Sequence, residues 1–382
     1  MAQGLVISSD SHVFEPPDLW TKRIDARFRS RAPRIQRVGE ADHLVVESDL
    51  TIAGIGLISN AGARFDAPET ISDHGKFEDV LPGGYEPDRH LRDMEIDGVA
   101  GEVLYPSQGL FYFKVADSAL MSAIFRAYND WLAEFCQVAP DRLKGIAMIS
   151  LDDVSEGIAE LERTAKLGFA GAMISEYPPE DRRYDHASYE PFWAAAQDLE
   201  MPLSLHTATR RLGLNSGAAK RTIHDASRRA TKAFLPALSL SDIIFSGVCE
   251  RYPRLQLAIV EFELSWAPYL INTMDYTYRE RHEEAAYRFK NAMLPSDFFH
   301  RQVFLSFQED AVGIRLRDLI GVRNIMWGSD YPHSESTFPQ SLEILDRILD
   351  GVPEAERSRI VGENAAELYG FDLNRRASGT AG

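Results

Sequence analysis

Carboxylate and imidazole side chains close several short apolar runs of this sequence, and together they could hold a metal ion. Of eight such runs along the chain, the first is followed by Asp10 and His12, the fifth by His206, the sixth by Glu261 and the eighth by Asp330. Mixed oxygen and nitrogen ligands suit Zn²⁺, Mn²⁺ or Fe²⁺, whereas Mg²⁺ and Ca²⁺ favour oxygen alone. These residue types therefore predict a site for a divalent cation, provided that the ends of the runs meet in the fold.

The spacing of Asp10 and His12 matters, because side chains two residues apart on a strand point to the same face. Both can therefore reach one ion. A D-x-H pair is weak evidence alone, and the alternative is a capping aspartate beside a hydrogen-bonded histidine at a strand end. His206 and Asp330, which follow other runs, favour the metal interpretation.

Glu15 and His224 extend the prediction to a second metal ion. Glu15 comes shortly after the D-x-H pair, and His224 follows His206 on a long connection. If both side chains reach the same rim, the site holds two ions bridged by carboxylates, so we expect one or two ions per chain. The alternatives are a carboxylate at a helix start for Glu15, which precedes Pro16 and Pro17, and a surface position for His224.

Three further side chains lie close to the candidate ligands in the sequence. His333, three residues beyond Asp330, could act as a general acid because an imidazole titrates near neutral pH, or it could simply contact Asp330. Arg210 and Arg211 follow His206 and could clamp a substrate carboxylate with paired hydrogen bonds. Pairing of these two arginines with surface acids is the slightly favoured alternative.

The apolar runs that precede these residues are continuous rather than alternating, as in strands covered on both faces of a parallel sheet. They span residues 5–9, 99–105, 145–150, 170–175, 202–205, 255–260, 303–307 and 325–328, and helical patterns such as 118–138, 154–167, 189–199 and 338–349 separate them. Eight strands with crossover helices predict an α/β fold, the (β/α)₈ TIM barrel. In that fold the C-terminal ends of the strands gather functional residues on one rim.

The first two predicted strands are separated by far more chain than one crossover helix needs. Residues 20–90 therefore form a long insertion between strands one and two, with hairpin strands expected at 43–47 and 51–58. Such insertions usually act as lids or interfaces. We expect residues 1–374 to form a single barrel domain and the small, polar tail 375–382 to be disordered.

The composition disfavours several classes of protein. The 382 residues include 41 Lys+Arg and 58 Asp+Glu, and the formal net charge of −17 argues against nucleic acids and anionic membrane surfaces as partners. Cys136 and Cys249 form no spaced pair, which excludes a disulfide framework and a thiolate zinc site. No apolar stretch has the length of a membrane span and no signal-peptide pattern is present, so we expect a cytoplasmic protein.

Several motifs, taken in order, resemble one family. They are SSDSHVFEP at the first run, SLHTATR at the fifth, FSGVCERYPRLQLAIVEFELSW into the sixth, SFQEDAVGI at the seventh, MWGSDYPHSESTFP at the eighth and GENAAELYGF near the end. The set resembles the amidohydrolase-related metal-dependent hydrolases, in the branch that contains aminocarboxymuconate-semialdehyde decarboxylase and resorcylate-type decarboxylases. The resemblance covers the whole barrel and is specific for the family, but it says little about the substrate.

The resemblance also implies roles for single residues. Asp10 and His12 would be the first-strand ligands, His206 the fifth-strand ligand, and Asp330 an eighth-strand ligand that also moves a proton. Many members carry a histidine where this chain has Asp10 and another where it has Glu261. A carboxylate at the sixth strand can still transfer protons but alters the charge of the site, so Mn²⁺ and Fe²⁺ stand beside Zn²⁺ as candidates.

Together these features predict a metal-dependent hydrolase that acts on a small carbonyl-containing organic substrate. The metal would activate a water molecule, Asp330 or Glu261 would move its proton, and His333 would serve as a further acid. Three alternatives stay open: a non-oxidative decarboxylase of a small aromatic carboxylic acid, a dinuclear iron or manganese oxygenase, and a non-catalytic scaffold subunit. We expect a homodimer, with a heteromer formed with a paralogue as the alternative.

Overall fold

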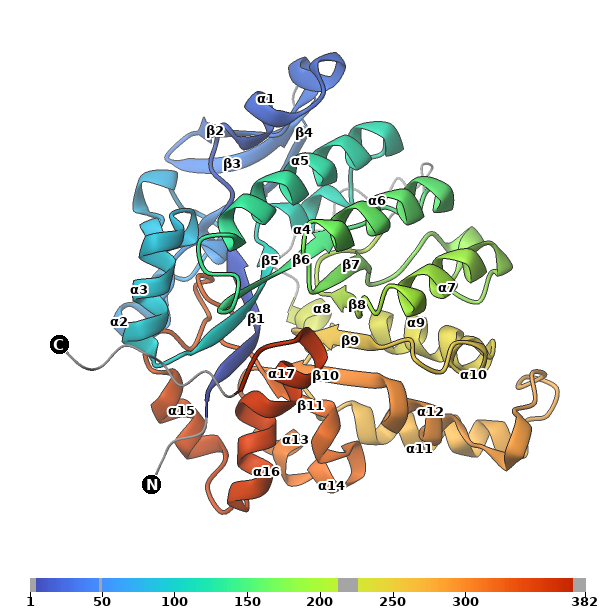
Figure 1. Ribbon diagram of the computed structural model, residues 1–382. Helices are drawn as coiled ribbons and strands as arrows, with labels where there is room; N and C mark the ends of the chain where they lie inside the picture. Colours follow the sequence, from blue (N-terminus) through green and yellow to red (C-terminus); the bar gives the residue numbers. More distant parts are fainter. Residues whose placement is uncertain (1–4, 48–49, 212–225, 374–382) are drawn as a thin grey trace.

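Eight parallel strands form a barrel at the centre of the computed structural model, which describes residues 5–47, 50–211 and 226–373 (Figure 1). Neighbouring strands follow the order β1-β5-β6-β7-β8-β9-β10-β11. They are β1 (Ile7–Val13), β5 (Gly101–Pro106), β6 (Leu143–Met148), β7 (Gly171–Ser175), β8 (Leu203–His206), β9 (Leu257–Val260), β10 (Val303–Phe307) and β11 (Ile325–Trp327). Each corresponds to one of the eight predicted apolar runs, so the TIM barrel is confirmed.

The barrel closes where the segment after β11 meets β1. Asp330 N donates a hydrogen bond to Asp10 O at 2.8 Å, and His12 N donates to Tyr331 O at 2.5 Å. Lower in the barrel, Ser9 Oγ donates to Trp327 O at 2.9 Å. This closing seam, defined by the contacts of residues 8–12 with residues 327–331, thus lies directly at three of the sequence-predicted site residues.

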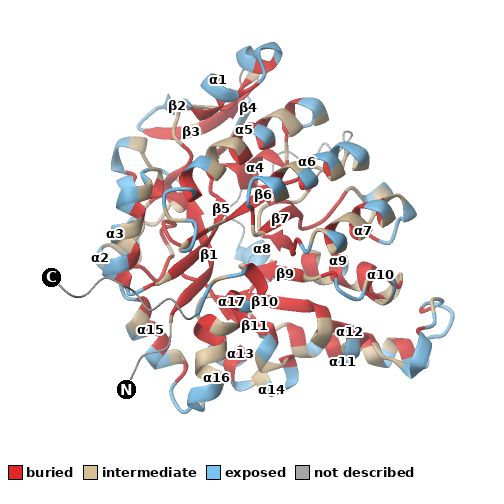
Figure 2. Ribbon diagram, viewed as in Figure 1, coloured by how far each residue is buried: buried red, intermediate tan, exposed pale blue. Residues whose placement is uncertain are grey.

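Helices cover the outside of the barrel, with buried inner faces and exposed outer faces (Figure 2). The longer ones are α3 (Pro87–Asp97), α5 (Ser118–Cys136), α6 (Val154–Lys166), α7 (Glu190–Asp198), α9 (Phe234–Phe245), α11 (Ala267–Glu280), α12 (Pro295–Gln302) and α15 (Ser341–Ile348). Asp117 and Asp153 cap α5 and α6 by accepting hydrogen bonds from the first free backbone N–H groups. No helix in the described ranges combines the length and the apolar character needed to cross a membrane.

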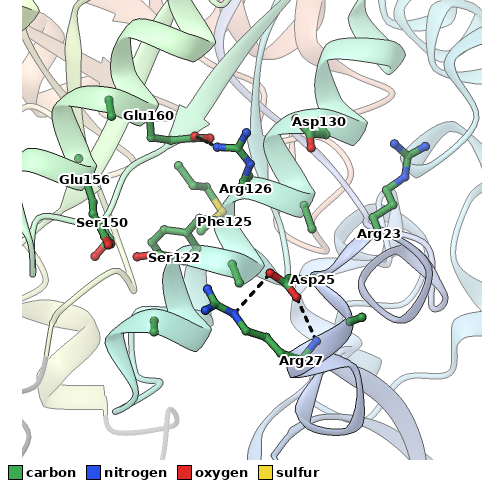
Figure 3. A pocket seen from close by; sticks show the side chains of 17 residues that line it. Arg23, Asp25, Arg27, Ser122, Phe125, Arg126, Asp130, Ser150, Glu156 and Glu160 are labelled. Atoms are coloured by element: carbon green, nitrogen blue, oxygen red, sulfur yellow. Dashed lines mark hydrogen bonds and ion pairs between the residues drawn. The ribbon is translucent and has the colours of Figure 1, made fainter.

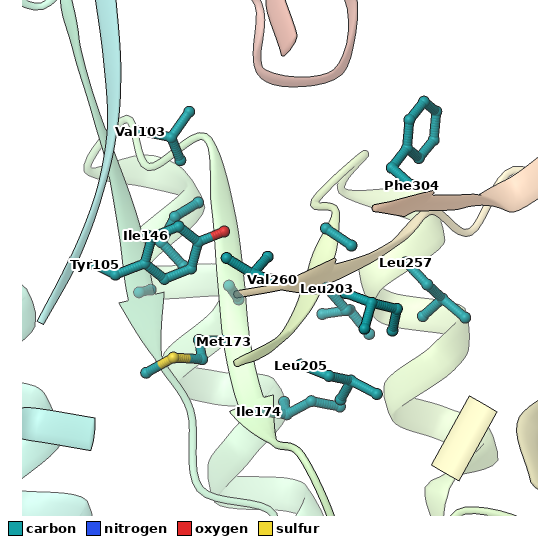
Figure 4. Close-up of a cluster of buried hydrophobic side chains, with 14 of the residues drawn as sticks. Val103, Tyr105, Ile146, Met173, Ile174, Leu203, Leu205, Leu257, Val260 and Phe304 are labelled. Atoms are coloured by element: carbon teal, nitrogen blue, oxygen red, sulfur yellow. The ribbon is translucent and has the colours of Figure 1, made fainter. Parts of the chain in front are cut away.

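The strands are buried on both faces, which explains why their sequences are continuously apolar. Figure 4 shows side chains from β5 to β10 packed together, including Val103, Ile146, Met173 and Leu205, all with no exposed surface. Tyr105 brings a hydroxyl into this core, and its oxygen lies 2.8 Å from Ser204 Oγ. A polar group placed so deep is satisfied by a hydrogen bond, as buried hydroxyls require.

A separate antiparallel sheet follows β1 in the chain and lies beside α1 (Leu19–Arg23) and α5 in Figure 1. Its strands are β2 (Arg34–Val38), β3 (Ala41–Val46) and β4 (Leu50–Gly54). The sequence predicts only two of these strands and extends the second to residue 58, whereas the structure ends β4 at Gly54 and turns through Gly56–Ile58. The expectation missed β2 because its residues RIQRV are mostly polar and exposed.

The insertion packs against the rim of the barrel through a second apolar cluster. Phe14, Phe111 and Ala208 on the rim contact side chains of the insertion, namely Leu44, Ala53, Ile55, Ile58 and Val80. Hydrogen bonds add to this contact: Phe14 N donates to Gly84 O at 2.6 Å, and Ser334 N donates to Leu57 O at 3.0 Å. The insertion is thus fixed to the rim, and both of its predicted roles, lid and interface, stay predictions.

Gly328 lies at the end of β11, and its missing side chain leaves room for Asp10. A Cβ at this position would lie 2.5 Å from Asp10 Cβ and 3.0 Å from Ser306 Oγ. We therefore expect Gly328→Ala to lower the free energy of unfolding by about 3 kcal/mol, measured by urea denaturation, because the extra atom must push β1 away from β11.

Gly39→Ala is the matched control, since a Cβ there meets nothing within 4 Å and only the positive φ of 65° resists it. Its expected loss is about 1 kcal/mol. Equal losses for the two variants would show that the closing seam accommodates a methyl group without strain.

Candidate metal centre

The ends of β1, β8, β9 and β11 bring six titratable side chains together. They form two overlapping groups, one of Asp10, His12, His206 and Glu261, the other of His12, Glu261, Asp330 and His333. In each group, one ligand atom from every residue lies within 4.8 Å of the others. Because the groups share two members, we treat all six residues as one site and call it the rim cluster.

His12 is central in the rim cluster. Its Nε2 lies 3.4 Å from Asp10 Oδ1 and 3.3 Å from Asp330 Oδ1. His206 Nε2 lies 3.4 Å from the same Asp10 oxygen and 3.7 Å from Glu261 Oε2. Two imidazole nitrogens and three carboxylates therefore converge on one small volume at the mouth of the barrel.

Backbone carbonyls determine which nitrogen each imidazole ring presents to this volume. His12 Nδ1 lies 2.9 Å from Pro106 O, and His206 Nδ1 lies 3.1 Å from Thr207 O. A carbonyl oxygen only accepts hydrogen bonds, so both Nδ1 atoms carry a proton, and in the neutral form of each ring the Nε2 atom offers a lone pair. Metal-binding histidines are usually held by such a second contact, which fixes the ring and its tautomer.

Two buried atoms of the rim cluster, His12 Nε2 and Asp330 Oδ1, have no hydrogen-bond partner among the described residues. His333 Nδ1 lies 2.7 Å from Asp330 Oδ1 as an ion-pair contact. Buried polar atoms are nearly always bonded, so two neighbouring atoms without a partner need an explanation. A divalent cation held by Asp10, His12, His206 and Asp330 supplies one, and these residues fit the predicted cofactor.

Strained backbone follows the strands that carry the carboxylates. Glu261 has a φ of 66° and Asp330 a φ of 61°, each directly or closely after its strand. Ala208, after β8, has a φ of 68°. Left-handed conformations at non-glycine residues cost of order 1 kcal/mol or more and persist where the surroundings impose them, often at functional sites. The sharp turns direct the two carboxylates into the rim cluster.

The electrostatic environment shifts the pKa values of His12, Asp330 and Glu261 in different directions. Burial opposes the charged form of His12, but its contacts with Asp10 and Asp330 outweigh burial and raise its pKa well above the usual value. Burial also opposes ionisation of Asp330, yet His333 and His12 hold its pKa far below the usual range. Burial and the nearby Asp330 raise the pKa of Glu261 well above the usual range. Glu261 is therefore the carboxyl that retains its proton most strongly.

Glu15, expected as a metal ligand, belongs to neither group. Its two carboxylate oxygens accept hydrogen bonds from Gln108 N at 2.8 Å and Gly109 N at 2.9 Å, at the start of α4 (Gly109–Tyr112). Burial raises the pKa of Glu15 to about 7. Through these contacts Glu15 ties the segment after β1 to the segment after β5, and its role as a metal ligand stays a prediction. His224 lies outside the described residues, and the second ion stays a prediction.

His333 is held by contacts on three sides. Its ring stacks on His12 with centroids 3.9 Å apart, its Nδ1 faces Asp330, and its Nε2 lies 3.1 Å from Ser107 Oγ. The sequence reasoning missed Ser107. It directly follows β5, so the same search for polar residues at strand ends would have found it.

Arg211, a candidate carboxylate clamp, serves the fold instead. Its buried guanidinium contacts the carboxylate of Asp152 and donates to the carbonyl oxygens of Phe113 at 3.0 Å and Val115 at 2.5 Å. Arg211 thereby joins the loops that follow β5, β6 and β8. Arg210, the other candidate, makes no such contact with a carboxylate among the described residues.

A cavity of about 610 Å³ lies away from the rim cluster, between α1, α5 and α6 (Figure 3). Two pairs of charged side chains lie in its lining: Arg126 Nη1 lies 3.0 Å from Glu160 Oε2, and Arg27 Nε lies 3.4 Å from Asp25 Oδ2. None of the rim-cluster residues lines it. This cavity is therefore separate from the candidate metal centre.

Comparison with known proteins defines the class of this chain. A family model described as amidohydrolase matches residues 85–371, and the chain belongs to this family. Gamma-resorcylate decarboxylase from Polaromonas sp. (strain JS666) is 28% identical over 304 residues, which cover 75% of this chain and 88% of the relative. The enzyme of the same name from Rhodococcus jostii is 26% identical over 332 residues, which cover 81% of this chain and 97% of the relative.

Solved structures confirm the fold. An amidohydrolase from Mycobacterium avium subsp. paratuberculosis superposes with a TM-score of 0.78 at 20% identity, covering 97% of this chain and all of the other. A dihydroxybenzoic acid decarboxylase from Polaromonas sp. JS666, solved with bound manganese and the inhibitor 2-nitroresorcinol, gives a TM-score of 0.61 at 21% identity and covers 98% of each chain. A divalent metal is thus consistent both with the rim cluster and with proteins of this fold.

We expect His12→Ala and Asp330→Asn each to lower the affinity for Mn²⁺ by about 100-fold or more, because each removes a donor that no neighbour replaces. Isothermal titration of protein stripped with EDTA measures this affinity. Glu15→Gln is the control, and its affinity for Mn²⁺ should stay within about threefold of the original, since backbone amides hold its carboxylate. A loss of Mn²⁺ binding in Glu15→Gln equal to that of His12→Ala would contradict the assignment.

Arg211→Met should lower the free energy of unfolding by about 3 kcal/mol, because Asp152 then keeps a charge with no buried partner. Arg210→Met should cost less than about 1 kcal/mol, since the guanidinium of Arg210 forms no ion pair with a carboxylate among the described residues and its backbone contact with Glu176 is retained. Chemical denaturation followed by circular dichroism measures both values. The reverse order of the two losses would mean that Arg210, not Arg211, stabilises these loops.

Proposed function

We propose that this chain is a divalent-metal-dependent, non-oxidative decarboxylase of an aromatic carboxylic acid. The observation that carries the proposal is the rim cluster, which offers imidazole and carboxylate donors at the mouth of the barrel. Relatives that span three quarters or more of the chain are named gamma-resorcylate decarboxylases. The family membership alone does not select this reaction, but the relatives favour it.

Decarboxylation breaks the bond between the ring carbon and the carboxyl carbon, releases CO₂ and places a proton on the same ring carbon. It consumes neither water nor electrons. The protein must therefore hold the carboxylate, keep the ring in place and deliver one proton. A bound divalent cation would hold the carboxylate oxygens and withdraw negative charge from them.

The residues of the rim cluster divide these tasks. Asp10, His12, His206 and Asp330 would hold the cation. His333 orients the Asp330 carboxylate through its 2.7 Å contact. Glu261 belongs to both groups of the rim cluster. Its side chain is 23% exposed, whereas the other five side chains of the cluster are at most 7% exposed. A carboxyl group at the edge of the cluster can deliver a proton to the substrate and recover one from solvent.

The hydrolase expected from the sequence has less support than its decarboxylase alternative. The relatives named above are decarboxylases, and hydrolysis would need water to add across the bond that breaks. The dinuclear oxygenase also loses support, because backbone amides hold Glu15, one of its two additional ligands. A homodimer and a cytoplasmic location stay predictions.

Incubation of the Mn²⁺-loaded protein with a panel of hydroxybenzoates in D₂O tests the proposal. We expect release of CO₂ and one deuterium at the ring carbon that loses the carboxylate, measured by mass spectrometry. Glu261→Gln should lower kcat by about 100-fold or more, because an amide cannot supply the proton. Glu335→Gln, which removes a partly exposed carboxylate from the loop after β11, is the matched control and should keep kcat within about twofold.

Two results would refute decarboxylation. One is incorporation of ¹⁸O from labelled water into the products without release of CO₂, which would indicate hydrolysis. The other is full activity after exhaustive removal of metal by EDTA. A normal kcat for Glu261→Gln would leave the reaction standing but would remove Glu261 as the proton donor.

A further inference from the structure

Cations gather on one side of the rim cluster, beside β7 and β8. Lys114 follows α4, Arg210 follows β8, and Arg228 lies in α8 (Ala226–Ala230), so all three lie on connections at the C-terminal ends of the strands. Each acts electrostatically on Glu176, the residue directly after β7. Within the described ranges, no carboxylate lies within ion-pair distance of these three cations.

The backbone fixes this group of cations next to a candidate metal ligand. Ser175 pairs with His206 in the ladder between β7 and β8, and Glu176 is the next residue after Ser175. Thr209 links the two segments, because its hydroxyl donates to His206 O at 2.6 Å and accepts from Glu176 N at 2.8 Å. A group bound among these cations would therefore be close to the metal centre.

Aromatic rings hold the two central cations without neutralising them. Lys114 Nζ lies 4.7 Å from the centroid of Phe111, and Arg210 Cζ lies 5.7 Å from that of Tyr177. Cation–π contacts of this kind orient a cation but leave its hydrogen-bond donors free. Arg210 Nε is buried and has no hydrogen-bond partner among the described residues, so one donor of this guanidinium is unused.

The local charge is positive. Burial raises the pKa of Glu176 to about 8, so its carboxyl group is mainly neutral at neutral pH. Burial lowers the pKa of Lys114 to about 8, which still leaves the ammonium mainly protonated. A guanidinium and an ammonium with free donors match a carboxylate, which accepts several hydrogen bonds and compensates the charge.

We propose that Lys114 and Arg210 bind a second carboxylate of the substrate, whose first carboxylate lies at the rim cluster. The substrate class is therefore an aromatic dicarboxylic acid. This inference rests on the proposed decarboxylase function, which places the first carboxylate at the rim cluster. Phe111 lies beside Lys114 and belongs to the same apolar cluster as Phe14, so an apolar surface adjoins these cations and could receive the ring of such a substrate.

Isothermal titration of the Mn²⁺-loaded protein with benzoate, isophthalate and terephthalate tests this subsite without any turnover. At least one dicarboxylate should bind about tenfold more tightly than benzoate, the monocarboxylate that lacks the second anion. Lys114→Gln and Arg210→Gln should each remove most of this preference and leave the affinity for benzoate unchanged. Lys114→Arg should retain the preference, because it keeps the charge.

Arg229→Gln is the matched control. It removes one positive charge from the same short helix as Arg228, but Arg229 is neutralised by an ion pair with Glu335 at 2.7 Å. This variant should keep the full preference. The benzoate affinity and the Mn²⁺ stoichiometry of every variant show that the rim cluster is intact.

Equal binding of benzoate and both dicarboxylates by the original protein would overturn the subsite. Loss of affinity for benzoate and dicarboxylates alike in Lys114→Gln and Arg210→Gln would overturn it as well, because both residues would then act on the first carboxylate. A dicarboxylate preference without release of CO₂ would refute the decarboxylase and leave the subsite standing. Release of CO₂ from monocarboxylates without any preference for dicarboxylates would refute the subsite and support the decarboxylase.

Discussion

The hydrogen bond between Asp330 N and Asp10 O, 2.8 Å long, is the constraint on which the site depends. It closes the barrel between its first and last strands. It also joins the backbones of two residues whose carboxylates would hold the metal. The hydroxyl of Ser8 supports it by donating to Asp10 O and accepting from Ser329 N, both at 2.9 Å. Closing the fold and assembling the ligands are therefore the same event, and a change that opens the seam also disperses the donors.

A second constraint is electrostatic. Three carboxyl groups and three imidazoles share one largely buried volume, where charges of the same sign repel strongly and solvent screens little. Without a cation, His12 is the positive group that lies against both Asp10 and Asp330. A divalent ion would take over this role and let the imidazole act as a neutral ligand. The same electrostatic constraint applies to Lys114, Arg210 and Arg228 beside β7, because in the described part of the chain these cations form no ion pair with the acids of the rim cluster.

Sequence reasoning recovered the barrel because each of its strands is buried on both faces and therefore reads as a continuous apolar run. It also placed Asp10, His12, His206, Glu261 and Asp330 at one rim, since strand ends of a barrel share a side. It missed β2, whose exposed residues carry no apolar pattern. It also missed the backbone contacts of Glu15, because nothing in the local sequence shows which amides will approach a carboxylate. The sequence did not indicate a role for Lys114 or Glu176, because each contacts charged residues that lie on other connections of the barrel.

The closing seam also bears on how the protein is made. The residues that it joins lie near positions 10 and 330, so almost the whole chain separates the two halves of the metal centre. Contacts between such distant positions carry a high entropic cost and generally form after local structure. A growing chain emerges from the ribosome with its N-terminal end first, and Asp10 and His12 must wait for the last strand. A metal ion that needs donors from both ends of the chain would therefore bind only after the barrel is complete.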